Sequence, residues 1–436
     1  MAKKQSDFRY NTGDTRVPWA AVGENYHADD VAGFVRFLMQ GGGDDYEQAF
    51  RRVEESLAAL QALSHPPGKL SLGEQVAATE AAADRYLGVE GSVFVTNATA
   101  GFEIAYKYAN LRPGDEVIVP AVTFIATMAY PLSVGAKVVF ADVDPVTVNI
   151  DVKDVERKLT PNTRMVVPVH IGGYPADMQP LMALCRARGV LVLEDTAHAF
   201  GAQYKGQKAG TIGDFGAYSF HEVKNITSFG EGGIVTTNVP GFKDDMKRAR
   251  FFGLDFSSPI DNWLYNVTAI RGRYGPFVAG NYSTTEIQAL GLRLQIARND
   301  AIIASRRRAA EYLNSRFAQD DAIIPQSLGS ADIVPTFHLY LLQIDPQKAG
   351  GDIRRLKKLL TEKGVTNIPH FGPLYRFQVV RDMGYNVDEI AQGCPVCEEV
   401  FYRRFTHLPI YGLTGGQLEY MADAVLESLK EMRGGR

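Results

Sequence analysis

The stretch YSFHEVKNITSFGEGG, residues 218–233, holds a single lysine, Lys224. It stands between two short apolar runs that are typical of strands, GAYSF (216–220) and GIVTT (233–237). A lysine in such a connection is commonly a solvated surface residue. A lysine held at the floor of a site can instead attack a carbonyl group, provided that its amine is uncharged. The rest of the chain has to decide between these two interpretations.

A carboxylate stands at the end of another predicted strand. Asp195 closes the run VLVLED (190–195) and precedes the loop TAHAFGA. In open α/β sheets, the carboxyl ends of the strands border the crevice where ligands bind. The alternative is that Asp195 only caps a helix or orders a loop. His198, three residues further on, is by itself more typical of a satisfied polar residue than of a catalyst.

Two further segments offer a phosphate cradle and an aromatic cover. SVFVTNATAGFEIAYKYAN predicts a strand and then a helix that opens with Ala98, Thr99 and Ala100, with Thr99 as its N-cap. The free N–H groups of a helix start bind anions, although every strand-to-helix connection offers them. Phe124, in PAVTFIATMAY, follows another strand, where its ring either covers a flat ligand or packs in the core.

Pyridoxal phosphate needs this combination of residues. A lysine forms a Schiff base with its aldehyde, a carboxylate keeps its pyridine nitrogen protonated, an aromatic ring stacks on it, and a helix start holds its phosphate. Burial beside a positively charged pyridinium lowers the pKa of Lys224, which is the direction that attack requires.

The elements that position these residues follow from the apolar runs. Predicted strands are SVFVT (92–96), EVIVP (116–120), KVVFADV (137–143), MVVPVH (165–170), VLVLED (190–195), GAYSF (216–220) and GIVTT (233–237). Amphipathic helical stretches separate several of them. This alternation predicts a mostly parallel α/β sheet with helices on both faces. No GxGxxG motif follows the first strand, which argues against a dinucleotide-binding domain.

The order of the elements predicts three parts. We expect an N-terminal segment at 1–70 with an irregular helical insertion at 41–70, a large cofactor-binding domain at 71–283, and a smaller C-terminal α/β domain at 284–436. The last part opens with one long helical run and continues with a strand, TFHLYLLQI, and helices in GDIRRLKKLLTEKG and GGQLEYMADAVLESLKEM.

The composition excludes several classes of function. The 436 residues are 45% hydrophobic and 22% charged, with a net charge of −4. This balance gives no electrostatic case for binding nucleic acid or an anionic membrane. The N-terminus lacks the apolar core of a signal peptide, and no run approaches the roughly 18 apolar residues of a membrane span. We therefore expect a cytoplasmic protein without a nucleic-acid or membrane partner.

The cysteines do not indicate a disulfide framework or a metal centre. There are three, Cys185, Cys394 and Cys397, and an odd, small number argues against paired disulfides. Cys394 and Cys397 have the CxxC spacing, but no second pair completes a set of four zinc ligands. We interpret the motif as incidental and expect no metal.

The motifs in their order resemble those of the DegT/DnrJ/EryC1/StrS aminotransferases, which act on sugars and cyclitols and share the fold-type-I architecture of aspartate aminotransferase. The resemblance spans residues from about Tyr26 to the C-terminus, apart from 41–70. The motifs that carry it are TNATAGFEIAY, PAVTFIATMAY, PVHIGGYPADM, LEDTAHAFGA, GTIGDFGAYSFHEVKN, GEGGIVTTN, GNYSTTEIQALGL and HLPIYGLT.

The resemblance implies roles around the cofactor ring. Lys224 forms the Schiff base and Asp195 pairs with the pyridine nitrogen. His198 lies near the phenolic oxygen of the ring, at a position where the family has Gln or His. Phe124 matches the aromatic residue that stacks on the ring.

The resemblance also implies the phosphate contacts. Ala98, Thr99 and Ser219 match contacts within one subunit. Asn281, in GNYS, matches a residue that reaches the phosphate of the neighbouring subunit. A homodimer with composite active sites is therefore expected.

Three departures from the family pattern concern the substrate more than the core chemistry. Ser283 stands where the family has an arginine, and Gly172 stands where a tyrosine is common, which we interpret as a larger pocket. The insertion at 41–70 is longer than the usual link.

The leading hypothesis is transamination in amino-sugar biosynthesis for a polysaccharide or an antibiotic. Glutamate or glutamine donates the amino group, a keto sugar, often nucleotide-linked, or a cyclitol accepts it, and Lys224 moves the proton between the substrate and the cofactor. One alternative is a sugar dehydratase of the same family; there a histidine replaces the lysine, so Lys224 argues against it. An aromatising lyase can use the lysine. The other alternative is a non-catalytic regulator that binds the cofactor, which no basic patch supports.

Overall fold

The computed structural model describes residues 26–65, 69–255, 266–367 and 371–434. Its centre is a seven-stranded sheet in the order β1-β9-β8-β5-β4-β2-β3. The strands are β1 (Val93–Val95), β2 (Glu116–Pro120), β3 (Lys137–Ala141), β4 (Thr163–Val166), β5 (Leu191–Asp195), β8 (Phe215–Ser219) and β9 (Gly233–Thr237). β9 is antiparallel to both neighbours, and the other neighbouring pairs are parallel. The predicted mostly parallel α/β sheet is confirmed.

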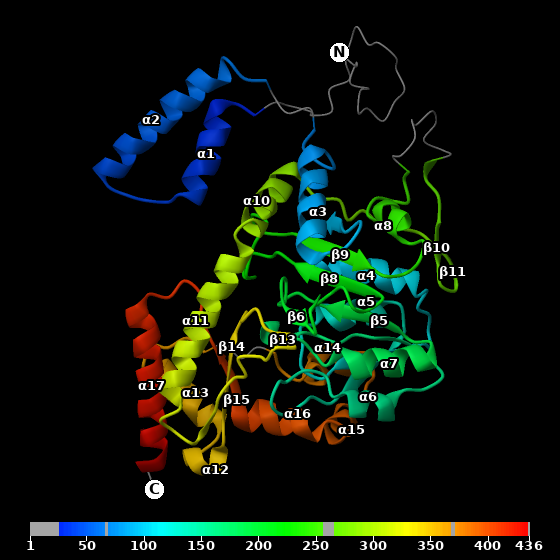
Figure 1. Cartoon of the computed structure of the whole chain (residues 1–436), viewed down its shortest axis with the longest axis vertical. Coiled ribbons are helices and arrows are strands. Elements are labelled where there is room, and N and C mark those ends of the chain that lie inside the picture. Colours follow the sequence, from blue (N-terminus) through cyan, green and yellow to red (C-terminus); the bar gives the residue numbers. More distant parts are fainter. Residues whose placement is uncertain (1–25, 66–68, 256–265, 368–370, 435–436) are drawn as a thin grey trace.

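Helices cover both faces of this sheet (Figure 1). The covering helices are α3 (Glu74–Leu87), α4 (Ala98–Tyr108), α5 (Ala126–Ser133), α6 (Val152–Lys158), α7 (Met178–Arg188) and α8 (Lys243–Ala249). Apolar residues of α4, α5 and α8 pack on one face, and those of α6 and α7 pack on the other. Strand residues that alternate between the faces are therefore buried on both sides, as near-continuous apolar strands require.

Short strands complete this part of the chain. β6 (Gln203–Tyr204) and β7 (Gln207–Lys208) form a small sheet with β13 (Ile333–Val334). β10 (Ile270–Gly272) and β11 (Gly275–Phe277) form an antiparallel pair.

A second core lies in the C-terminal part of the chain. It contains the antiparallel sheet β12 (Ile323–Ile324), β14 (Tyr340–Ile344) and β15 (Phe405–Leu408), with α11 (Asn299–Phe317), α12 (Pro346–Ala349), α13 (Ile353–Glu362) and α17 (Gly415–Gly434) around it. The long helical run predicted after residue 284 is two helices. The first, α10 (Glu286–Ile296), packs with α3 against the central sheet.

The chain returns from the second core to the first. Residues around α14 (Gln378–Asp382), α15 (Val387–Gln392) and α16 (Pro395–Glu399) pack into the large core, Cys394 and Cys397 among them. A cut at residue 284 does not describe this exchange of segments, and the domain boundaries stay a prediction.

The N-terminal helices form a hairpin beside the body of the molecule, near α10 (Figure 1). α1 (Ala28–Leu38) and α2 (Asp44–Gln61) are joined by the ion pair between Arg36 and Glu47, at 2.9 Å. The helical character expected for the insertion at 41–70 is found at 44–61, which forms one continuous helix rather than an irregular one. Its first turn is rich in acidic residues, which favours a helix N-terminus. Residues 66–68 of the insertion lie outside the described residues.

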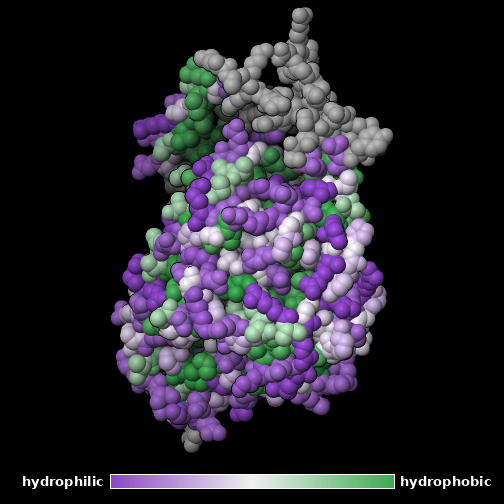
Figure 2. Space-filling view, turned by 45° about the vertical axis from the view of Figure 1, so that its right-hand side comes forward, coloured by the Kyte–Doolittle hydropathy of each residue, from purple (hydrophilic) through white to green (hydrophobic). Residues whose placement is uncertain are grey.

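The surface drawn in Figure 2 is mostly hydrophilic below the hairpin. No helix in the described part of the chain is long and apolar enough to cross a membrane.

Candidate active site

The predicted site residues gather at one edge of the central sheet. β5 ends at Asp195 and β8 ends at Ser219, and these parallel strands finish on the same side. The antiparallel strand β9 begins there, where Gly233 pairs with both Val95 and Ser219. This edge is where open α/β sheets bind their ligands.

The helix start at this edge is capped by Asn97. Its side-chain oxygen accepts a hydrogen bond from the Ala100 N–H at 3.0 Å, and its backbone is extended. The prediction of Thr99 as the N-cap is wrong, because Thr99 is already the second residue of α4. The N–H groups of Ala98 and Thr99 stay in the first turn, where no preceding carbonyl of the helix can bond them.

Gly233 lets the strand pass close to this helix start. A Cβ at Gly233 would lie 2.3 Å from the carbonyl carbon of Asn97 and 2.8 Å from the Ala98 nitrogen. Any side chain would therefore separate β9 from α4 and would fill the place that an anion at the helix start needs.

Asp195 is a buried carboxylate with one oxygen committed and one open. Oδ1 accepts a hydrogen bond from the Ala197 N–H at 3.0 Å, and Oδ2 has no hydrogen-bond partner within the ranges the structure describes. Burial raises the pKa of Asp195 to about 6, and Ala197, Lys224 and His170 act against the rise. Such a carboxylate favours a cationic partner at its open oxygen.

Lys224 lies in the turn between β8 and β9, where its N–H donates to the His221 carbonyl at 2.9 Å. Burial lowers the pKa of its amine, while Asp195 and Glu231 act in the opposite direction. Nζ makes no hydrogen bond or ion pair with another described residue. The structure thus brings the amine and Asp195 close enough to interact and leaves the amine available for a ligand.

His198 is buried, with 7% of its surface exposed, and lies in a stack of rings. The His338 ring packs on it with a centroid separation of 4.3 Å and an angle of 24°, and the Phe371 ring lies 5.3 Å away. Both of these rings come from the C-terminal part of the chain.

Phe124 stands at the same edge and is 58% exposed as a residue, so the alternative that it packs in the core is wrong. The carbonyl of Phe124 accepts hydrogen bonds from the N–H and the hydroxyl of Thr127, which fix the backbone at the start of α5. The ring is therefore exposed to solvent and available to cover a flat ligand.

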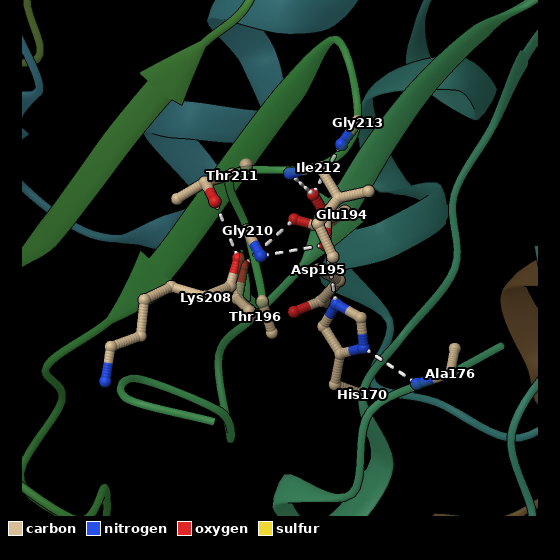
Figure 3. Close-up of polar contacts among 12 residues, drawn as sticks. His170, Ala176, Glu194, Asp195, Thr196, Lys208, Gly210, Thr211, Ile212 and Gly213 are labelled. Carbon is tan, nitrogen blue, oxygen red and sulfur yellow. Dashed lines mark hydrogen bonds and ion pairs between the residues drawn. The ribbon is translucent and has the colours of Figure 1, made fainter. Parts of the chain in front are cut away.

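Glu194 faces the opposite side of the sheet from Asp195, because successive strand residues alternate (Figure 3). Its carboxylate is fully buried and accepts from the N–H groups of Gly210, Ile212 and Gly213 at 2.6 to 2.8 Å. His170 Nε2 lies 3.0 Å from it, and His170 Nδ1 accepts from the Ala176 N–H. Since Nδ1 accepts, Nε2 carries the proton and donates to Glu194.

Asn281 is exposed, and its side-chain oxygen accepts from the N–H and the hydroxyl of Ser283. The next residue, Tyr282, accepts at its carbonyl from the Thr96 N–H at 3.1 Å. This segment therefore runs beside the helix start of its own chain. Ser283, which the resemblance matches to an arginine of the family, donates to Asn281 here and orders this turn.

Gly172 lies against β14. It is buried, its φ is +61°, and a Cβ would meet the Leu341 side chain at 3.1 Å. A side chain at this position would therefore be strained, and the interpretation of a larger pocket stays a prediction.

Cys394 and Cys397 are buried and free. Burial raises the pKa of the Cys394 thiol to about 12 and that of Cys397 well above its ordinary value. Thiols held protonated in this way are poor nucleophiles and poor metal ligands. Among the described residues, no group of three or more His, Cys, Asp and Glu side chains could hold a metal ion.

Sequence reasoning missed Asn97, Asn225, His338 and Phe371. Asn97 and Asn225 are adjacent to residues that were named, and both have side chains suited to capping and bridging. His338 and Phe371 come from distant segments, and no local pattern indicates that they reach His198.

The seven-stranded sheet, with Asp195 at the end of β5 and Lys224 on the turn after β8, agrees with the architecture of the fold-type-I aminotransferases. The model of the DegT/DnrJ/EryC1/StrS aminotransferase family matches residues 51–426, and the chain belongs to that family.

Individual relatives cover most of the chain. An uncharacterised protein of Methanocaldococcus jannaschii is 32% identical over 376 residues, which are 84% of this chain and 92% of the relative. The aminotransferase DesV of S. venezuelae, solved with a ketimine intermediate, is 28% identical with a TM-score of 0.71, over 88% of this chain and 96% of DesV. The aminotransferase TlmJ of Streptoalloteichus hindustanus is 26% identical with a TM-score of 0.73, over 90% of this chain and 98% of TlmJ.

Proposed function

We propose that the protein is a pyridoxal-phosphate-dependent transaminase that transfers an amino group from glutamate or glutamine to a keto sugar, often nucleotide-linked, or to a cyclitol. The observation that carries the proposal is the pairing of Asp195, buried with one open oxygen, with Lys224, whose amine burial shifts toward its neutral form. Membership of an aminotransferase family supports the reaction type.

The residues present fit pyridoxal phosphate. The open oxygen of Asp195 accepts a proton-bearing ring nitrogen, the exposed ring of Phe124 covers a flat heterocycle, and the N–H groups of Ala98 and Thr99, with Ser219, hold a phosphate. Gly233 supports the fit independently, because a Cβ there would fill the space beside the helix start.

When bound, the cofactor supplies an electron sink that stabilises negative charge on the substrate carbon. The protein does the rest. Asp195 holds the proton on the ring nitrogen, and Lys224 takes the proton from the amine-bearing carbon and returns it. Phe124 and the stack around His198 limit the access of water. Proton transfer by a positioned lysine contributes roughly 10² to 10⁴ in rate.

We also propose that the active unit is a homodimer in which Asn281 contacts the phosphate of the partner's site. The proximity of Tyr282 to Thr96 makes a contact within the same chain the competing outcome. The test mixes a Lys224→Ala protein with an Asn281→Ala protein and lets subunits exchange. A mixed dimer with shared sites has one intact site, so each mixed dimer should regain up to half of the activity of a wild-type dimer. No recovery after proven exchange places Asn281 in its own site.

A donor and acceptor screen tests the reaction. Glutamate or glutamine should bleach the visible absorbance of the bound cofactor, and mass spectrometry of the acceptor should show a carbonyl oxygen replaced by an amine. A product that has lost water and gained no nitrogen would support the dehydratase or lyase instead. A protein that never binds the cofactor would contradict the proposal.

A further inference from the structure

The segment Thr336–His338 is anchored on the candidate site although it leads into the second core. The Thr336 hydroxyl donates to the His198 carbonyl at 2.8 Å. The backbone N–H groups of Thr336 and His338 donate to the carbonyls of Gly173 and Gly172, at 2.9 and 2.8 Å. The residue between them, Phe337, has a φ of +50°, in the left-handed region that bulky residues rarely adopt. Such a conformation persists only where its surroundings hold it.

Asn225, the residue after Lys224, joins the catalytic turn to this segment. It is 8% exposed, and its amide makes two contacts there. Nδ2 donates to the Thr336 carbonyl at 3.1 Å, and Oδ1 lies 2.9 Å from His338 Nδ1.

These two contacts determine which nitrogen of His338 carries a proton. The Thr336 carbonyl only accepts, so the amide group of Asn225 must direct its NH₂ toward it. Oδ1 then faces His338 Nδ1, and Nδ1 must donate. Asn225 thus selects the Nδ1–H form of His338 and fixes the plane of its ring.

The oriented ring is the one that packs on His198. The two imidazoles stack at 4.3 Å. A continuous path of contacts therefore runs from the turn of Lys224 through Asn225 and His338 to His198. It connects the loop after β8 with the loop after β5.

The second core holds the same segment from the other side. Arg306 of α11 is 3% exposed, and its Nη1 lies 3.4 Å from the Phe337 carbonyl and 3.2 Å from the His338 carbonyl. Its guanidinium packs over the Tyr411 ring at 4.4 Å. The segment is therefore clamped between the two cores.

We propose that Asn225 is a positioning residue that couples the Lys224 turn, through His338, to His198 and to the C-terminal core. Its role in catalysis rests on the proposed function, but the coupling itself is a property of the protein without cofactor. Loss of Asn225 releases the turn and lets the His338 ring rotate, so that water reaches the lysine.

The test compares Asn225→Ala with a matched control, Asn314→Ala. Asn314 also uses both ends of its amide, to the Gln326 carbonyl at 2.9 Å and from the Tyr340 hydroxyl at 2.6 Å, but within the second core. In cofactor-free protein, amide hydrogen exchange of a peptide covering 336–339 should accelerate at least about tenfold in Asn225→Ala and stay unchanged in Asn314→Ala. Equal protection of this peptide in Asn225→Ala and the wild type would overturn the coupling.

A spectroscopic titration separates positioning from general stability. The pH at which the visible band of the bound cofactor changes should rise by about half a unit in Asn225→Ala, because water favours the protonated nitrogen. Asn225→Asp adds a negative charge to those of Asp195 and Glu231, so the midpoint should rise by about one unit or more. Asn314→Ala should leave it in place. Unshifted midpoints in both Asn225 variants would overturn the catalytic part of the proposal.

The hydrogen-exchange and spectroscopic measurements can fail separately, so the coupling through Asn225 and the proposed function are tested independently. A wild-type protein without any visible band would count against the cofactor only, while hydrogen exchange would still decide the coupling. If Asn225→Ala fails to fold, Asn225→Asp, which keeps the bond to His338 and loses the one to Thr336, provides the same two measurements.

Discussion

Glu194 and Asp195 are neighbours on one strand, and the protein treats their carboxylates in opposite ways. Glu194 is surrounded by three backbone N–H groups and an imidazole, so its charge is fully compensated inside the fold. Asp195 receives one backbone hydrogen bond and keeps an open oxygen, and burial raises its pKa. A satisfied buried charge holds a turn in place, whereas an unsatisfied one is prepared for a ligand.

The same contrast separates two lysines. Lys158 donates to the Asp154 carboxylate at 2.7 Å and to the carbonyls of Phe140 and Gly393. Lys224 has no such partners in the described chain, and burial lowers the pKa of its amine. In both pairs, the number of hydrogen-bond partners, rather than the residue type, distinguishes the group that the fold satisfies from the one that it leaves open to a ligand.

The largest expected effect is on Lys224. Lys224→Ala should lower turnover at least about a thousandfold and remove the visible cofactor band, with little change in thermal stability. Lys158→Ala should do the reverse, with a lower melting temperature and nearly normal turnover per folded protein. Borohydride reduction followed by peptide mapping identifies the lysine that binds the cofactor. A label on another lysine would contradict the assignment.

Substitutions of Asp195 and Glu194 should likewise have different effects, on turnover for Asp195 and on stability for Glu194. Asp195→Asn should lose at least about a hundredfold in turnover, because a neutral amide no longer holds the proton on the ring nitrogen. Glu194→Gln should lower the free energy of unfolding by about 3 kcal/mol or more, since a Gln amide cannot accept from every donor that faces it. Chemical denaturation and steady-state kinetics of both variants check this. Near-normal turnover in Asp195→Asn would return Asp195 to the status of a loop residue.

The stability of the cofactor-free protein should depend on pH through Asp195. Its pKa is raised in the folded state to about 6 from 3.8, so the folded protein binds the proton more tightly than the unfolded chain. The contribution to stability therefore falls as the pH rises from about 4 to about 6, and a shift of this size corresponds to about 3 kcal/mol. The Asp195→Asn protein should not lose stability through this group between about pH 4 and about pH 6, because an amide does not titrate in this range. Parallel stability curves for the two proteins would show that the carboxylate is compensated after all.

The smallest effect concerns the helix start. Asn97→Ala should cost about 1 kcal/mol of unfolding free energy and weaken cofactor binding, because it removes the cap of α4. Thr99→Ala should change the unfolding free energy by no more than about 0.5 kcal/mol. A larger cost for Thr99→Ala would restore Thr99 as the residue that orders the cradle.

Sequence reasoning located the parts that depend on local pattern. The runs EVIVP and GIVTT match β2 and β9 residue for residue, because β-branched residues, which favour strands, dominate both runs. The N-cap was displaced by two residues, since TNAT offers three polar candidates and only the backbone conformation selects Asn97. The contact of His338 with His198 depends on how the second core packs against the large core. No hydrophobic periodicity or motif spacing in the sequence indicates this packing. The roles of Lys224 and Asp195 in catalysis stay predictions until the variants are measured.

The way in which β8 and β9 pair has a consequence for engineering. Ser219 and Gly233 face each other, so the loop that bears Lys224 leaves and re-enters the sheet at one point. This pairing holds the two ends of the loop in register, so residues 220–232 are a segment that can be replaced by the corresponding loop of a relative. Its inner contacts reach the Thr336 carbonyl through Asn225 and α10 through the Ser228 hydroxyl, which donates to the Gln288 carbonyl. A loop taken from a relative should therefore pair correctly with the sheet. It should function only if residues 336–338 are replaced by those of the same relative.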